Sequence, residues 1–189
     1  GAYLDTYFLA DSPELKAGAC RPAVVVCPGG GYAYTSDREA EPIALALCAR
    51  GFHACVLRYP CAPARFPAAL RALAEAVAWV RAGAAENHVD PRQISVCGFS
   101  AGGHLAGSLG VFWNAPFLAA ETGLAPQDMR PDKMVLCYPV ITGGEFAHKG
   151  SFDNLLGADA DAARRAEVSL EQHVTQDTPP AFLWHTYTD

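Results

Sequence analysis

The sequence lacks the patterns that mark nucleic-acid-binding and membrane proteins. Its 189 residues include 14 lysines and arginines against 20 aspartates and glutamates, and the basic residues form no cluster. Nucleic-acid binding requires a basic patch that neutralises phosphates, so we expect no nucleic-acid partner. No apolar run approaches the ~20 residues of a membrane-spanning helix, and no basic and then apolar segment resembling a signal peptide opens the chain. We therefore expect a cytoplasmic protein with no membrane partner.

Metal-binding and disulfide patterns are missing as well. The seven cysteines are irregularly spaced, without a C-x-x-C pair or a His/Cys cluster. Several of them, including Cys27, Cys55, Cys97 and Cys137, fall within or at the end of apolar runs. We interpret them as small buried hydrophobic residues in a reducing compartment, with no disulfides. The sequence predicts neither a metal nor another cofactor.

Apolar residues are plentiful, at 51% of the chain against 18% charged residues. This composition predicts one globular domain over residues 1–189 with a hydrophobic core. The oligomeric state is left open, and a homo-oligomer is one alternative. Short apolar runs predict strands at 3–9, 23–27, 52–59, 94–97, 133–138 and 181–185, and longer patterns predict helices at 42–50, 66–84 and 101–109. Apolar strands that alternate with helices indicate the α/β class, with a mostly parallel sheet covered on both faces.

Two segments interrupt this alternation, and we interpret them as inserts at about 113–132 and 142–177. The first is rich in proline and is expected to be irregular. In the second, residues 142–157 are expected to form a loop and residues 158–174 a helix, with capping-box spacing from Ser169 to Gln172. Inserts beside strands that carry chemistry commonly form the walls or the lid of a site.

The pattern G-x-S-x-G, at Gly98 to Gly102, lies between an apolar run and a segment that can start a helix. A serine on a tight strand-to-helix turn has a strained backbone that projects its hydroxyl into open space, and the flanking glycines leave room for it. The turn also places the serine at the N-terminus of the helix, where free N–H groups favour an oxyanion. We therefore predict that Ser100 is a nucleophile; a structural serine in a turn is the alternative.

Three consecutive glycines, Gly29 to Gly31, follow the apolar run at 23–27. Consecutive glycines cost backbone entropy, so a purely connecting loop would rarely use them. They allow main-chain N–H groups to approach a ligand atom closely, and a flexible surface turn is the alternative. Tyr32, which follows directly, either lines a substrate pocket for the acyl group or packs against the loop.

Together these segments resemble the α/β-hydrolase superfamily, and are similar to bacterial acetyl-xylan-esterase-like and hormone-sensitive-lipase-like small-ester hydrolases. The resemblance covers nearly the whole chain and includes Asp90-Pro91, the segment 100–106 and the segment 178–186. The loop of glycines looks like the H-G-G-G loop of that family, with Pro28 in place of histidine. In the family, amides of this loop and the amide after the nucleophile hold the oxyanion, which implies Gly30, Gly31 and Ala101 here.

The resemblance also implies a catalytic triad in the chain order serine, acid, histidine. Asp189, at the exit of the last predicted strand, matches the position of the acid, with an exposed terminal aspartate as the alternative. No histidine follows it. His104 is interpreted as packing support beside Ser100, while His148 and His173 are weaker candidates for a base. We therefore expect an incomplete α/β-hydrolase that lacks the last strand, the histidine loop and the final helix, with its catalytic histidine beyond residue 189.

The function implied by the resemblance is that of a serine carboxylesterase. Its small-molecule substrate would be a short-chain, acetyl-type ester, such as an acetylated carbohydrate derived from xylan, cleaved through an acyl-enzyme on Ser100. We expect the 189-residue chain alone to be impaired. Two alternatives stay open, namely a non-catalytic relative that binds ligands and a hydrolase of amides or formamides.

Overall fold

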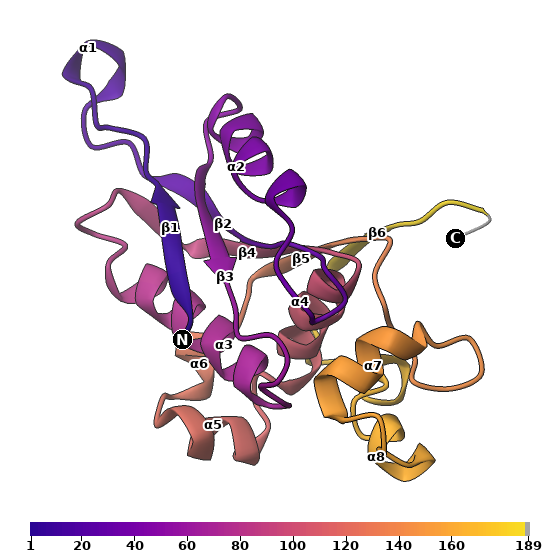
Figure 1. The fold of residues 1–189 in the computed structure, drawn as a ribbon. Helices are drawn as coiled ribbons and strands as arrows, with labels where there is room; N and C mark the ends of the chain where they lie inside the picture. The colour runs from indigo at the N-terminus through magenta and orange to yellow at the C-terminus, as the bar shows by residue number, and fades with distance from the viewer. Residues whose placement is uncertain (188–189) are drawn as a thin grey trace.

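A computed structural model describes residues 1–187 of the chain. These residues form a sheet of six strands with helices on both faces (Figure 1). The strands are β1 (Tyr3–Tyr7), β2 (Arg21–Cys27), β3 (His53–Arg58), β4 (Val89–Phe99), β5 (Lys133–Cys137) and β6 (Ala181–Trp184). They lie in the order β1-β3-β2-β4-β5-β6. β1 is antiparallel to β3, and every other neighbouring pair is parallel. The mostly parallel sheet predicted from the sequence is confirmed.

The helices form two layers over this sheet. They are α1 (Pro13–Lys16), η1 (Asp37–Glu39), α2 (Glu41–Cys48), α3 (Ala68–Ala82), α4 (Ala101–Phe112), α5 (Pro116–Thr122), α6 (Pro126–Met129), α7 (Lys149–Leu156), α8 (Ala162–Ala166) and η2 (Leu170–Gln172). α2 covers one face, and α3 and α4 cover the other (Figure 1). Within residues 1–187, none of these helices combines the length and the apolar character that crossing a bilayer requires.

Burial on both faces explains the composition of the central strands. In β2, Val24 and Val26 pack on the side of α2, whereas Val25 and Cys27 pack on the side of α3 and α4. All four side chains are buried, so a polar side chain at any of these positions would lose its hydration when the chain folds. The wholly apolar pattern that predicted the strand is a direct result of this double coverage.

The first insert, expected to be irregular, contains the two short helices α5 and α6. Both begin with a proline in the first turn, where the missing N–H group would have no helical partner in any case. α5 ends at Gly123, which has a left-handed backbone with φ 70°. Pro116, Pro126 and Gly123 therefore mark helix boundaries, and the expectation of irregular structure was wrong.

The second insert also differs from its prediction. Residues 149–156, expected in a loop, form α7, because the side chain of His148 accepts a hydrogen bond from the N–H group of Ser151, and Phe152 and Leu155 become buried. Residues 158–174, expected to form a helix, contain only α8 and η2.

The capping box predicted at Ser169 does not form. The hydroxyl of Ser169 accepts a hydrogen bond from the N–H group of Gly143 at 2.9 Å, and Glu171 accepts one from the hydroxyl of Thr142 at 2.8 Å. Both side chains therefore bind the start of the insert, and the hydroxyl of Ser169 also donates to the carbonyl of Arg165 at 2.9 Å. These contacts hold the two ends of the insert together.

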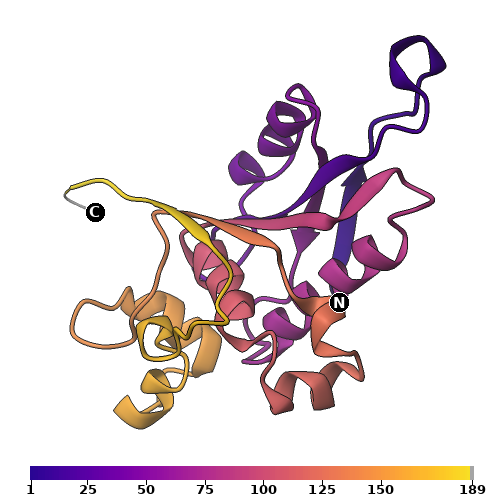
Figure 2. The ribbon, with the colours of Figure 1, turned by 180° about the vertical axis from the view of Figure 1, so that it is seen from behind.

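The last described strand, β6, lies at the edge of the sheet opposite β1 (Figure 2). It pairs with β5, and all four of its residues are exposed, including Phe182, Leu183 and Trp184. Because β4, β5 and β6 are parallel neighbours, their C-terminal ends lie on the same side of the sheet. Ser100 lies on this side, directly after β4.

Candidate active site

Ser100 occupies a sharp turn between β4 and α4. Its backbone has φ 53° and ψ −117°, a strained conformation for a residue with a side chain. Two hydrogen bonds fix the turn to the end of β5: the N–H group of Ser100 donates to the carbonyl of Cys137 at 3.1 Å, and its carbonyl accepts from Val140 at 3.0 Å. The predicted strand–turn–helix context of Ser100 is therefore confirmed.

The glycines around Ser100 lie where no side chain fits. A Cβ atom on Gly98 would collide with the backbone carbonyl of Gly102, and a Cβ atom on Gly102 would collide with the carbonyl oxygens of Cys27 and Pro28. These contacts are between backbone atoms, which cannot move aside as the end of a flexible side chain can. The turn can therefore form only with glycine at these two positions.

The loop of glycines packs directly against this turn. A Cβ atom on Gly29 would lie 3.2 Å from the Cβ atom of Ser100, while Gly30 and Gly31 have positive φ angles of 131° and 63°. No residue within 1–187 accepts a hydrogen bond from the N–H groups of Gly30, Gly31 or Ala101. Two segments that meet at the turn of Ser100 thus carry main-chain donors without a partner among the described residues, and such donors can stabilise negative charge.

An open cavity of about 570 Å³ lies in front of Ser100. The second insert forms one part of its wall, as its sequence position predicted, and the rest comes from Ser100, the segment that follows β5, and the C-terminal end of β6 with the residue after it. Its lining includes Tyr138, Ile141, Phe146, His148, Leu183 and His185. The cavity is therefore mainly apolar, with two imidazole groups at its edge.

Tyr32 lies outside this cavity. Its side chain is 3% exposed, and its hydroxyl lies 2.8 Å from Nδ1 of His104. The other ring nitrogen of His104, Nε2, lies 2.8 Å from the carbonyl of Val168 and must donate to it, so Nδ1 accepts the proton of Tyr32. Tyr32 therefore packs in the core and does not line the cavity, because its side chain is buried and its hydroxyl is bonded to His104. The interpretation of His104 as packing support is likewise confirmed.

Burial lowers the pKa of His104 to about 4, and the hydrogen bond to Val168 opposes this shift only in part. In the unfolded chain a histidine has a pKa of about 6.5, so below that pH the unfolded state binds a proton that the folded state excludes. We predict that His104 reduces the free energy of unfolding by about 2 kcal/mol between about pH 7 and about pH 5. The measurement is urea denaturation at both pH values for the wild type and for His104→Gln, which lacks this titration. Equal losses in the two proteins would contradict the prediction.

The remaining histidines differ in their distance from the cavity of Ser100. Asp189, predicted as the acid of the triad, lies outside the described residues. His148 and His185 both line the cavity, and Nδ1 of His148 also lies 2.8 Å from the hydroxyl of Ser151. The ring of His173 packs against Phe112 at a centroid distance of 4.8 Å and does not line the cavity.

Glu39 and Tyr138 were not identified from the sequence, although both lie beside the turn of Ser100. Glu39, in η1, accepts a hydrogen bond from the N–H group of Gly29 at 2.7 Å. Its other carboxylate oxygen accepts the hydroxyl proton of Tyr138 at 3.0 Å. No motif joins two residues that are 99 positions apart, so only the structure could reveal the contact.

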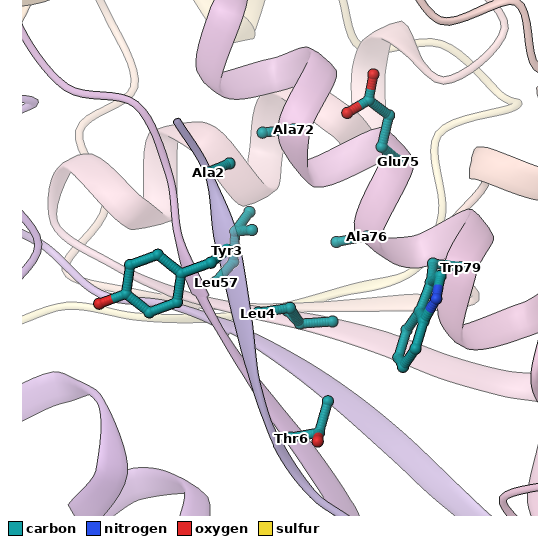
Figure 3. Close-up of a pocket in the computed structure, with 9 residues that line it drawn as sticks. All are labelled: Ala2, Tyr3, Leu4, Thr6, Leu57, Ala72, Glu75, Ala76 and Trp79. Carbon is teal, nitrogen blue, oxygen red and sulfur yellow. The ribbon is translucent and has the colours of Figure 1, made fainter.

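A second cavity, of about 310 Å³, lies between β1 and α3 (Figure 3). Its lining is mostly apolar, with Tyr3, Leu4, Leu57 and Trp79 as the large apolar side chains, and it includes the charged Glu75. None of the predicted site residues lines it. Within the described part of the chain, no three His, Cys, Asp or Glu side chains are placed to hold a metal ion.

Comparison with known proteins identifies the family of the chain. A model of the family described as BD-FAE matches residues 10–189. The chain is 35% identical to endo-1,4-beta-xylanase B of Butyrivibrio fibrisolvens over 178 residues, which cover 89% of this chain and 27% of that protein. It is 28% identical to an acetylxylan esterase of Xylanibacter ruminicola over 186 residues, which cover 93% of this chain and 34% of that protein. The chain therefore spans about a third or less of these two relatives.

Solved structures give a matching result for the fold. An acetyl ester-xyloside bifunctional hydrolase from Caldicellulosiruptor lactoaceticus is 38% identical, with a TM-score of 0.85, over 100% of this chain and 67% of that chain. The carboxylesterase Cest-2923 from Lactobacillus plantarum is 31% identical, with a TM-score of 0.82, over 98% of this chain and 67% of that chain. The α/β-hydrolase fold expected from the sequence is thereby confirmed.

Proposed function

The chain belongs to the BD-FAE family and has the α/β-hydrolase fold, and we propose that it is a carboxylesterase whose nucleophile is Ser100. One observation carries this proposal. The strained turn presents Ser100 to an open cavity and packs against the loop of glycines, and no residue within 1–187 accepts a hydrogen bond from the N–H groups of Gly30, Gly31 or Ala101. A hydroxyl next to preorganised main-chain donors is the arrangement that acyl transfer requires.

In the proposed reaction, Oγ of Ser100 attacks the carbonyl carbon of the ester. The carbonyl oxygen becomes an oxyanion that accepts hydrogen bonds from Gly30, Gly31 and Ala101. Collapse of this tetrahedral intermediate expels the alcohol, which takes up a proton, and leaves an acyl group on the serine. Water then attacks the acyl-enzyme in the same way and releases the acid and the free serine.

The proposed base is a histidine that follows Asp189, because the triad of this fold runs serine, acid, histidine along the chain. Within residues 1–187, His104 is unsuited to this role because both of its ring nitrogens are engaged in the core. Asp189 would orient the imidazole and stabilise its charged form. His148 and His185, which line the cavity, are the alternatives within the described residues.

We propose acetyl esters of carbohydrates as the substrates. This choice is supported by the activities named for two similar proteins, an acetylxylan esterase and an acetyl ester-xyloside bifunctional hydrolase. A cavity that is open on one side can place a small acyl group at Ser100 while a larger alcohol extends outwards. A short acyl group on a bulky alcohol is the substrate shape that fits.

The experiment that tests this function compares p-nitrophenyl acetate, butyrate and octanoate with acetylated xylan, using the protein in the length that its gene encodes. We expect the highest kcat/KM for the acetate, the release of acetate from xylan, and labelling of Ser100 by a fluorophosphonate. A higher rate on p-nitroacetanilide than on the acetate ester would favour the amide hydrolase. Tight binding of the ester with neither turnover nor labelling would favour the non-catalytic relative.

A further inference from the structure

We propose that Glu39 is a positioning residue, whose carboxylate joins the loop of glycines to the cavity wall and thereby aims the oxyanion donors at the substrate. This inference rests on the proposed function of Ser100 and concerns a residue that touches neither the substrate nor the nucleophilic oxygen. Its basis is the pair of hydrogen bonds that Glu39 accepts, one from Gly29 and one from Tyr138.

The contact with Gly29 fixes the first residue of the loop. Oε2 of Glu39 lies 2.7 Å from the backbone nitrogen of Gly29, a short bond of the charge-assisted kind. A Cβ atom on Gly29 would lie 2.7 Å from that oxygen and 2.9 Å from the carbonyl oxygen of Phe99, so the loop is held between Glu39 and the strand that leads to Ser100. With the N–H group of Gly29 engaged, those of Gly30 and Gly31 are left for the oxyanion.

The contact with Tyr138 ties the same carboxylate to the opposite side of the site. Tyr138 follows β5, lines the cavity and has a positive φ of 36°. Its backbone N–H group donates to the carbonyl of Trp184 at 2.6 Å, so it is fixed to β6 as well. Burial and, to a lesser extent, the bond to Glu39 raise the pKa of Tyr138 to about 12. The tyrosine is therefore protonated at neutral pH and donates to Glu39.

The geometry favours a positioning role over a direct chemical one. Both oxygens of Glu39 are occupied by donors of the scaffold, and no Lys, Arg or His among the described residues forms a salt bridge with it. A negative charge close to the oxyanion would by itself oppose the reaction. The carboxylate therefore contributes through geometry, because oxyanion donors act only when they are within hydrogen-bonding distance of the developing charge.

The test measures kcat and KM for p-nitrophenyl acetate in Glu39→Ala, Glu39→Gln, Tyr138→Phe and the double variant Glu39→Ala/Tyr138→Phe. We expect kcat to fall about 10²-fold in Glu39→Ala with KM changed less than about threefold, because a misplacement of about 1 Å has an effect of this size. Tyr138→Phe should lower kcat by about tenfold. Glutamine can accept from Gly29 and donate to Tyr138, so Glu39→Gln should stay within about fivefold of the wild type.

The double variant shows whether Tyr138 acts on kcat through Glu39 or independently of it. If Tyr138 acts through Glu39, the double variant should lose no more kcat than Glu39→Ala alone. A multiplicative loss, or a Glu39→Ala enzyme with kcat within about threefold of the wild type, would overturn the proposal. A Glu39→Gln enzyme as slow as Glu39→Ala would overturn it too, since the charge itself would then be required.

Asp37→Ala provides the matched control. Asp37 lies in the same short helix, its carboxylate is 92% exposed, and it pairs with Arg58 instead of the loop of glycines. We expect its kcat to stay within about twofold of the wild type, and Tm values of all variants show whether the fold is kept. The proposed function is tested separately by Ser100→Ala. If the wild type hydrolyses the ester and Ser100→Ala does not, the esterase proposal holds regardless of the results for the Glu39 variants.

Discussion

Replacement of Ser100 with alanine is expected to lower kcat for p-nitrophenyl acetate by ~10⁴–10⁶-fold. The substitution removes the attacking oxygen, so no acyl-enzyme can form, while the N–H groups of Gly30, Gly31 and Ala101, the proposed oxyanion donors, stay in place. The remaining rate would come from water attacking an ester that is still bound and polarised by these donors. KM should change little. The measurement is steady-state kinetics, together with the loss of fluorophosphonate labelling.

The controls for this prediction are His148→Ala and His185→Ala. Both side chains line the same cavity as Ser100, so their removal tests whether either imidazole serves as the base. We expect each to change kcat by less than about tenfold, because the proposed base follows Asp189. A Ser100→Ala protein with nearly wild-type kcat would refute the nucleophile. A loss in either histidine variant as large as that of Ser100→Ala would place the base within the described residues.

Substitution of Gly102 by alanine is expected to destabilise the fold by about 3 kcal/mol or more, at the upper end of what an overpacked core site loses. Its Cβ atom would overlap the carbonyl oxygens of Cys27 and Pro28, where β2 ends against the start of α4. Relief would require the helix to move away from the sheet, and the loop of glycines would move with it. Urea denaturation followed by circular dichroism measures the change.

Gly150→Ala is the matched control for Gly102→Ala. Gly150 lies in α7, and the nearest atom to an added Cβ, Cε1 of His148, is 3.9 Å away. Alanine there meets no backbone atom and favours the helix, so we expect unchanged stability or a gain of up to about 1 kcal/mol. Equal denaturation midpoints for the two variants would show that the contact at Gly102 is not tight.

Much of the fold could be predicted because its signals lie in consecutive residues. The wholly apolar run at Ala23 to Cys27 reflects a strand covered on both faces, and the stripe of Leu70, Leu73 and Val77 reflects one buried face of α3. The inserts were harder to predict. Their short helices bury few side chains, so the periodic signal is weak, and proline at a helix start has the same sequence appearance as proline in a loop.

By itself the sequence determined the α/β class, the turn at Ser100 and the loop of glycines. The class follows from apolar runs of consecutive residues. The turn and the loop depend on local backbone geometry, because a side chain at Gly98 or Gly102 would collide with backbone atoms and because Gly30 and Gly31 have positive φ angles. Only the tertiary structure decided which distant side chains meet. Glu39 reaches Tyr138 and Tyr32 reaches His104 across 99 and 72 positions of the chain, because strand order and loop paths bring them together. No pattern of neighbouring residues encodes such a contact, so the support around the site became visible only in the folded chain.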